Sequence, residues 1–171
     1  AVSGGSVSLL RVAALRSAGG FDESLSWRED WDMWLRLARV CRLRTVPEVL
    51  VGYRRGGGGM SSDYWQMVDG GRQILRKVAA VDPRLAGRDL DRALADDLAG
   101  IGGLAMIDGS YDAARELYRA AAKISRLSLQ RTFVRAVLAS GGPGHRLLER
   151  VPTLLAQRWV GVRAGEAFAL D

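Results

Sequence analysis

The 171-residue sequence is poor in the side chains that most often bind metals or form cross-links, with one cysteine, Cys41, and one histidine, His145. A single cysteine excludes an internal disulfide bond and is typical of a reducing compartment. With one histidine and no cysteine pair, the sequence offers no zinc-ligand spacing, and no metal site is expected within it. Cys41 lies late in a predicted helix on an apolar stretch, so we interpret it as a buried structural thiol.

Lysine is also scarce, because Lys77 and Lys123 are the only two, and arginine carries almost all of the formal net charge of +6. A basic chain favours acidic partners such as nucleotide phosphates or anionic lipid headgroups. A coding sequence that prefers arginine codons would give the same composition, and both interpretations stay open. The arginines are spread over the whole length instead of forming one basic face, so no nucleic-acid partner is expected.

Long hydrophobic runs are absent too: no apolar stretch reaches the roughly 18 residues that a membrane-spanning helix needs. The first residues, AVSGGSVSLLRVAAL, have no initiator methionine and lack the basic-then-apolar order of a signal peptide. This start is typical of the interior of a longer protein, as though the first half of a catalytic domain preceded it. We expect a cytoplasmic protein, with peripheral attachment to the inner face of the membrane as an alternative.

The first third of the sequence mixes strand and helix patterns. Residues 5–10 have strand character, residues 11–18 can form a short helix, and Gly19-Gly20 ends it. A longer helix is predicted from Glu29, with one apolar stripe formed by Trp31, Trp34, Leu35, Ala38 and Cys41. Two short strands are predicted at residues 43–46 and 49–53, on either side of Pro47.

The remainder of the sequence has helical spacing throughout. The four glycines at 56–59 mark the predicted boundary; this loop is either a lid or a plain linker. Helices are expected over about 64–81, from 88, from Ser110, which suits an N-cap, and over about 128–140 and 145–159. Residues 98–124 resemble the small-and-aromatic register of one tetratricopeptide repeat. Such a hairpin serves packing first and the binding of a protein partner second. The helix at 145–159 is amphipathic and either packs on the other helices or lies on an anionic membrane surface.

An acidic pair at the start of the helix from Glu29 is the strongest chemical signal. Glu29 and Asp30 are flanked by Trp27 and Trp31 at a junction between a loop and a helix. A carboxylate there can act as a general base beside a sugar ring, and the tryptophans can offer apolar faces to that ring. Acidic residues at helix starts also complement the helix dipole, and Asp32 is interpreted in this way. Trp31 can equally belong to the core.

Residues 2–62 resemble the second half of a family 2 glycosyltransferase with the GT-A fold. The resemblance rests on three submotifs in the family's order: SGGSVSLLRVAALRSAGGFDESL, the acidic pair in REDWDMWLRLA, and VPEVLVGYR. It implies an α/β fold, with the acceptor-side half of a GT-A catalytic domain at 1–60 followed by an all-α helical region at 61–171. It also implies inverting transfer of a sugar from a nucleotide-sugar donor to an acceptor hydroxyl, in polysaccharide or glycoconjugate synthesis.

By the same resemblance, Asp30 matches the family's general base and Glu29 a supporting carboxylate, while Trp27 and Trp31 would contact substrate. The family binds its donor diphosphate through a divalent metal, Mg²⁺ or Mn²⁺, on a DxD motif, and no such motif stands before the GGFDE turn here. Many relatives carry a histidine after the YR strand, where this sequence has Arg54 and Arg55. These two arginines would therefore contact the donor. The 171 residues alone are expected to be inactive, and the alternative function is a non-catalytic helical interaction module.

Overall fold

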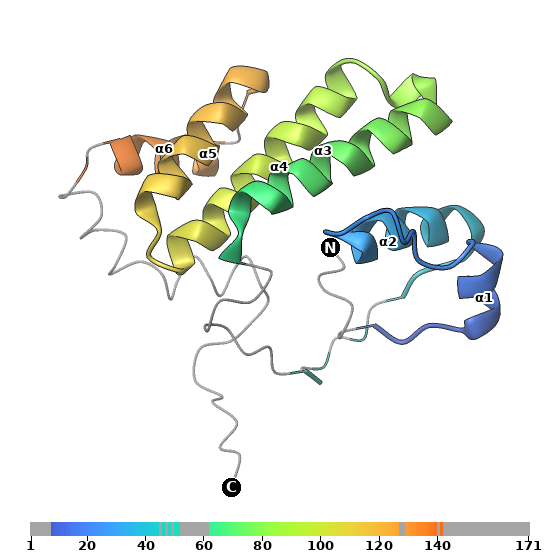
Figure 1. Ribbon diagram of the computed structural model, residues 1–171. Helices are drawn as coiled ribbons and strands as arrows, with labels where there is room; N and C mark the ends of the chain where they lie inside the picture. The colour runs from blue at the N-terminus through green and yellow to red at the C-terminus, as the bar shows by residue number, and fades with distance from the viewer. Residues whose placement is uncertain are drawn as a thin grey trace, which may run out of the picture. The chain divides into compact units, whose positions relative to one another are not determined.

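The computed structural model describes residues 8–44, 46, 48, 50–51, 62–126, 129–139 and 141. Within these ranges the chain forms six α-helices and one short 3-10 helix (Figure 1). The chain divides into two compact units, Ala1–Ile74 and Leu75–Asp171. None of the described helices has the length and apolar character needed to cross a membrane. The division after residue 60 that the family resemblance implies stays a prediction.

The predicted α/β fold with a partial GT-A sheet is wrong for the described part of the chain, which is 71% helical and contains no strand. Of the expected strands, residues 8–10, 43–44, 46 and 50–51 are described, and they form no ladder. Leu43 is 46% exposed and Leu50 73% exposed. The backbone N–H and C=O groups of a strand form hydrogen bonds only with a neighbouring strand. Strand-like residues that have no such neighbour among the described residues therefore form no sheet there.

The first unit contains α1 (Val12–Ser17), α2 (Glu29–Val40) and the first half of α3 (Tyr64–Val81). Met33, Trp34 and Leu37 of α2 form its core, against which the partly buried residues Leu10, Ala14, Leu15, Ala18 and Cys41 pack. The buried face of α2 therefore differs from the predicted apolar stripe. Of the predicted residues, Trp31 and Leu35 are only half-buried and Ala38 is exposed. Cys41 is half-buried, and its thiol donates to the Leu37 carbonyl oxygen at 3.2 Å.

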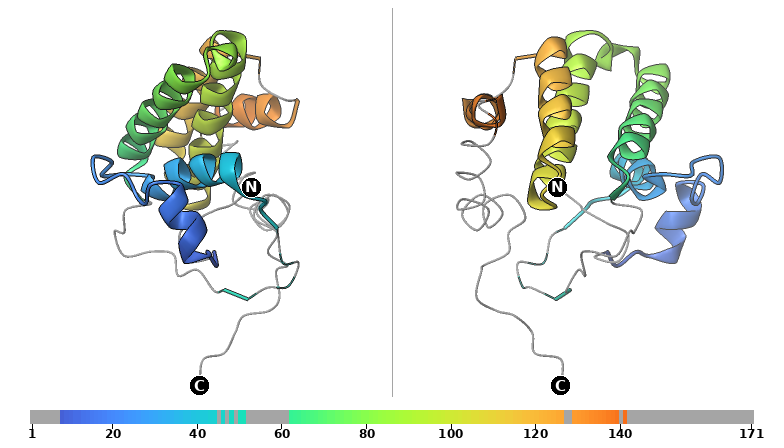
Figure 2. Two further views of the ribbon diagram at one scale, coloured as in Figure 1. Left: turned by 90° about the vertical axis from the view of Figure 1, so that its right-hand side faces the viewer. Right: turned by 60° about the vertical axis from the view of Figure 1, so that its left-hand side comes forward.

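The second unit contains η3 (Pro83–Leu85), α4 (Arg88–Ile107), α5 (Tyr111–Ile124) and α6 (Leu129–Ala139). Helices α4 and α5 form a hairpin and α6 packs against α5, as the two views in Figure 2 show. Gly109 turns the chain with a φ of 76°, and α5 begins directly after Ser110, which makes no side-chain capping hydrogen bond. The expected helix at 145–159 lies outside the described residues, as does His145.

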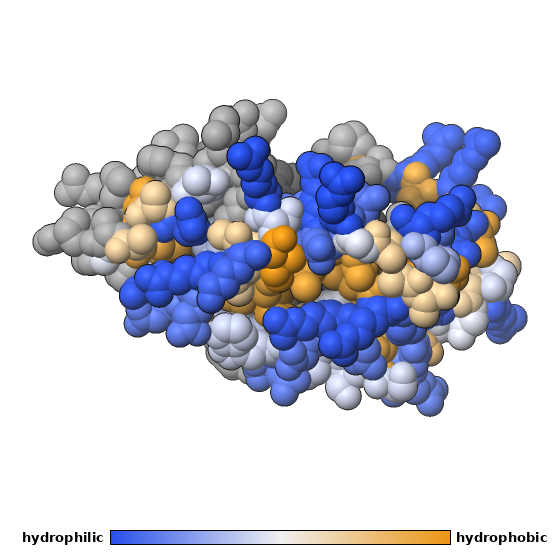
Figure 3. All heavy atoms as spheres, turned by 90° about the horizontal axis from the view of Figure 1, so that it is seen from above, coloured by the Kyte–Doolittle hydropathy of each residue, from blue (hydrophilic) through white to orange (hydrophobic). Residues whose placement is uncertain are grey.

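A glycine on α4 sets how closely the two helices of this hairpin approach. A Cβ atom added at Gly102 would come within 2.9 Å of Cδ2 and 3.0 Å of Cε2 of Tyr118, and Tyr118 is only 1% exposed. The hairpin therefore depends on a glycine at this position, as the small-and-aromatic pattern predicts. On the face drawn in Figure 3, long hydrophilic side chains border a band of hydrophobic residues, as expected for amphipathic helices.

Candidate functional site

The GGFDE segment forms the turn that leads from α1 toward α2. Gly19 and Gly20 have φ angles of 86° and 73°, a conformation that favours glycine. The Asp22 carboxylate oxygen Oδ1 accepts hydrogen bonds from the Ser24 backbone N–H at 2.9 Å and from the Ser24 hydroxyl at 2.6 Å. Leu25 is buried and anchors the segment. Asp22 thus has a structural role in this turn.

Helix α2 begins directly after Arg28, the one described non-glycine residue with a positive φ, at 60°. The backbone N–H of Trp31 donates to the Arg28 carbonyl oxygen at 3.0 Å and to Oδ1 of Asp30 at 2.7 Å. The Asp30 carboxylate is therefore held at the positive end of its own helix, where negative charge is stabilised.

Glu29 and Asp30 are half-buried, and each lies in the first turn of α2. Apart from the bond to Trp31, the described residues give Asp30 no hydrogen-bond or ion-pair partner, and they give the Glu29 side chain none. One oxygen of Asp30 is thus fixed by the backbone, while the other, Oδ2, stays available to a ligand. This arrangement lets the carboxylate accept a proton from a hydroxyl without first breaking an ion pair.

Asp32, two residues further on, has a different role. It is 3% exposed, and its Oδ2 accepts from Nε of Arg36 at 2.8 Å and lies 2.7 Å from the second guanidinium nitrogen. Arg36 also donates to the backbone carbonyl oxygen of Ala18 at the end of α1. Asp32 therefore joins α1 to α2 through Arg36, and it is not available as a second base.

The tryptophans beside the acidic pair lie against neighbouring parts of the first unit. The Arg28 guanidinium stacks over the Trp31 ring at 4.2 Å from its centroid and donates to the Met67 carbonyl oxygen of α3 at 3.3 Å. A Cβ atom at Gly70 of α3 would lie 3.0 Å from the Trp27 carbonyl oxygen. Trp27, Glu29, Asp30 and Trp31 thus lie together at the start of α2, and their functional roles stay a prediction.

The remaining predicted site residues and the metal are not placed there. Arg54 and Arg55 lie outside the described residues. Within the described part of the chain, no group of three or more His, Cys, Asp or Glu side chains could hold a metal ion. The spacing of Asp30 and Asp32 does not fit a metal site either, because Asp32 is buried against Arg36. The described residues therefore do not fit the divalent ion that the resemblance implies.

Sequence reasoning missed two residues that shape this site. Arg36 lies off the predicted apolar stripe, yet it links α2 to α1, and its i,i+4 spacing from Asp32 was the available signal. The close approach of Gly70 to Trp27 was not predicted, although a glycine inside a helix often marks such an approach.

No protein-family model, curated protein or solved structure matches this chain. The candidate site therefore rests on its own geometry and on the motif order in the sequence.

Proposed function

We propose that this chain provides the acceptor-side residues of an inverting sugar transferase, which moves a sugar from a nucleotide-sugar donor to an acceptor hydroxyl. One observation carries the proposal: Asp30 has one carboxylate oxygen held by the Trp31 N–H and the other without a partner among the described residues. A hydroxyl becomes a strong nucleophile when a base at hydrogen-bond distance removes its proton. Asp30 is such a base.

The neighbouring residues support this role for Asp30. Glu29, on the same first turn, would accept a second hydrogen bond from the acceptor and orient the attacking hydroxyl. The Arg28 guanidinium stacks over the Trp31 ring, 4.2 Å from the ring centroid, and fixes its orientation. The ring offers an apolar face of the kind on which sugar rings pack. Trp27 borders the same helix start, where its backbone lies against Gly70 of α3. This set accounts for acceptor binding and deprotonation.

Donor binding is not assigned to the described residues. In the proposal, the nucleotide diphosphate and its divalent metal are bound mainly by a donor-binding domain that is not among these 171 residues, and Arg54 and Arg55 are candidates for further contacts with the diphosphate. No step of the deprotonation by Asp30 depends on that metal. The 171-residue chain by itself is therefore expected to show no sugar transfer, and transfer by the purified chain would contradict this division of roles.

The test compares two isosteric changes in an enzyme that joins this segment to a donor-binding domain. Asp30→Asn should lower kcat by at least about 100-fold, the usual contribution of a general base, while the donor Kd changes little. Glu116→Gln, an exposed carboxylate on α5, is the matched control and should leave both constants unchanged. An equal loss of donor affinity in Asp30→Asn would show that Asp30 is not the base.

A second candidate function is a helical protein-interaction module in which Asp30 has no role. The observation that favours it is the compact second unit, in which α4 and α5 pack closely through Gly102 and Tyr118 and α6 covers α5. This function predicts a protein partner whose affinity for the full chain is unaffected by Asp30→Asn. A binding measurement with that variant, alongside the transfer assay, separates the two functions.

A further inference from the structure

The loop that precedes α2 ends in an unfavourable backbone conformation. Arg28 has φ and ψ angles of 60° and 29°, a left-handed conformation that brings the Cβ atom of any residue other than glycine close to the following carbonyl oxygen. Its own carbonyl oxygen accepts hydrogen bonds from the N–H groups of Trp31 at 3.0 Å and Asp32 at 3.2 Å. The conformation of Arg28 therefore sets the direction in which the first turn of α2, with Asp30, leaves the loop.

A residue persists in such a conformation only where its surroundings hold it there, and α3 supplies holding contacts. The Arg28 guanidinium lies 4.2 Å from the centroid of the Trp31 ring and donates to the Met67 carbonyl oxygen at 3.3 Å. One residue earlier, the Trp27 carbonyl oxygen lies 3.0 Å from the place of a Cβ atom at Gly70. Met67 and Gly70 are three residues apart and share one face of α3. Two consecutive residues of the loop thus lie along one face of this helix.

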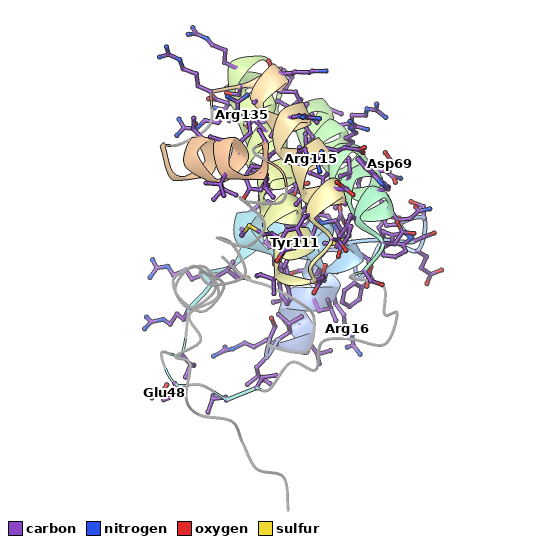
Figure 4. The ribbon with its side chains drawn as sticks, turned by 90° about the vertical axis from the view of Figure 1, so that its left-hand side faces the viewer. Arg16, Glu48, Asp69, Tyr111, Arg115 and Arg135 are labelled. Carbon is purple, nitrogen blue, oxygen red and sulfur yellow. The ribbon has the colours of Figure 1, made fainter. Side chains whose placement is uncertain are left out.

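Two adjacent glycines, Gly70 and Gly71, open α3 to these contacts. They follow Asp69, whose exposed side chain is labelled in Figure 4 and pairs with Arg72 of the same helix. Side chains on a helix lean toward its N-terminus, so side chains at positions 70 and 71 would lie over the Met67 carbonyl oxygen in the preceding turn. Glycine is unfavourable in a helix interior, but the pair at this place leaves the Met67 carbonyl oxygen accessible to the guanidinium.

We propose that Arg28 is a positioning residue of the candidate site and that the first turns of α3 belong to that site. Arg28 sets the place of Asp30 through the backbone and the orientation of the Trp31 ring through its side chain. Because α3 holds Arg28, a displacement of α3 against the loop would move the base and the ring together. This role rests on the proposed function, to which it adds the element that keeps the base aligned with the acceptor hydroxyl.

The first test perturbs α3 and leaves Arg28 unchanged. Gly70→Ala adds a methyl group 3.0 Å from the Trp27 carbonyl oxygen, so the loop must shift away from α3. In the enzyme that joins this segment to a donor-binding domain, this variant should lower kcat about three- to tenfold with little change in the donor Kd, because a misplaced catalytic group slows the chemical step. Gly100→Ala on α4 is the matched control: its methyl group meets nothing within 4 Å, and kcat should change less than about twofold. Both variants gain the same helix propensity, and circular dichroism checks that they remain folded.

The second test removes the guanidinium. Arg28→Gly keeps the left-handed conformation, which glycine adopts without strain, and should lower kcat about tenfold with little change in the donor Kd. Combined with Asp30→Asn, the same change should lower kcat less than about twofold further, because a positioning residue acts only through the group that it positions. A residue with a merely structural role would lower kcat by the same factor in both backgrounds.

The 171-residue chain tests the contact with α3 without a transfer assay. Within α3 the Gly71 N–H donates to the Met67 carbonyl oxygen, which also accepts from Arg28. Arg28→Gly should therefore shift the Gly71 amide signal in a two-dimensional ¹H–¹⁵N spectrum. Arg42→Gly, which removes an exposed arginine from the segment after α2, is the matched control and should leave that signal in place.

Three results would overturn the positioning role. One is an unchanged Gly71 signal in Arg28→Gly. Another is an equal kcat in Gly70→Ala and Gly100→Ala. The third is a rise in the donor Kd of Arg28→Gly as large as its loss of kcat, which would make Arg28 a direct contact to the donor. Absence of transfer by the unchanged joined enzyme would refute the proposed function, and this role with it, even where the Gly71 signal shifts.

Discussion

Two glycines of α4 give the sharpest test of the structure, because the same substitution should have opposite effects at positions two residues apart. A Cβ atom added at Gly100 meets nothing within 4 Å, whereas one added at Gly102 comes within 2.9 Å of the Tyr118 ring. Both residues lie in the interior of the same helix. The comparison therefore separates the backbone effect of replacing glycine from the packing effect of the added methyl group.

The expected magnitudes follow from these two effects. Alanine is more favourable than glycine in a helix interior by about 0.8–1 kcal/mol, so Gly100→Ala should stabilise the fold by about that amount. Gly102→Ala gains the same backbone term but loses about 1–3 kcal/mol to overpacking, because Tyr118 is 1% exposed and its ring has no open side. The two variants should therefore differ by about 1–3 kcal/mol in the free energy of unfolding, with Gly102→Ala the less stable.

Thermal unfolding followed by circular dichroism at a helix wavelength measures this difference. For a chain of this size, each kcal/mol shifts the midpoint by about 2–4 °C. Gly100→Ala should melt above the unchanged chain and Gly102→Ala at or below it. If both variants raise the midpoint equally, the Tyr118 ring does not lie against Gly102, and the close packing of α4 on α5 is wrong.

Two further changes test the candidate site. Asp32→Asn should destabilise the chain by about 1–3 kcal/mol, which is less than a fully buried ion pair would cost because the Arg36 side chain is 29% exposed. Asp30→Asn should cost less than about 1 kcal/mol, because it loses only the favourable position at the helix start. Urea unfolding measures both free energies of unfolding, and equal losses would refute this difference. Arg28→Gly should be more stable than Arg28→Ala by about 1–2 kcal/mol in the free energy of unfolding. Both variants lose the contacts to Trp31 and Met67, but only alanine has a Cβ atom that makes a φ of 60° unfavourable. Equal stabilities would show that the left-handed conformation is absent.

Local signals predicted much of the candidate site. Glycines with positive φ end α1, Asp22 forms its turn with Ser24, and α2 begins at Glu29, all within a stretch of about ten residues. Such features depend on neighbours in the chain, so a sequence pattern contains them. The role of Asp32 was predicted only as a dipole partner, because its burial against Arg36 and the bond from Arg36 to Ala18 depend on how α1 packs on α2.

The sequence by itself determined where the described helices begin, from helical periodicity and from glycine and proline breaks. It also placed the acidic pair beside two tryptophans. It did not determine whether residues such as Leu43 and Leu50 form strands, because a strand exists only when another strand supplies its hydrogen bonds, and the described chain places none beside them. Tertiary packing alone decided that Asp30 keeps an available oxygen while Asp32 is buried in an ion pair, since burial depends on the neighbouring elements and not on residue type.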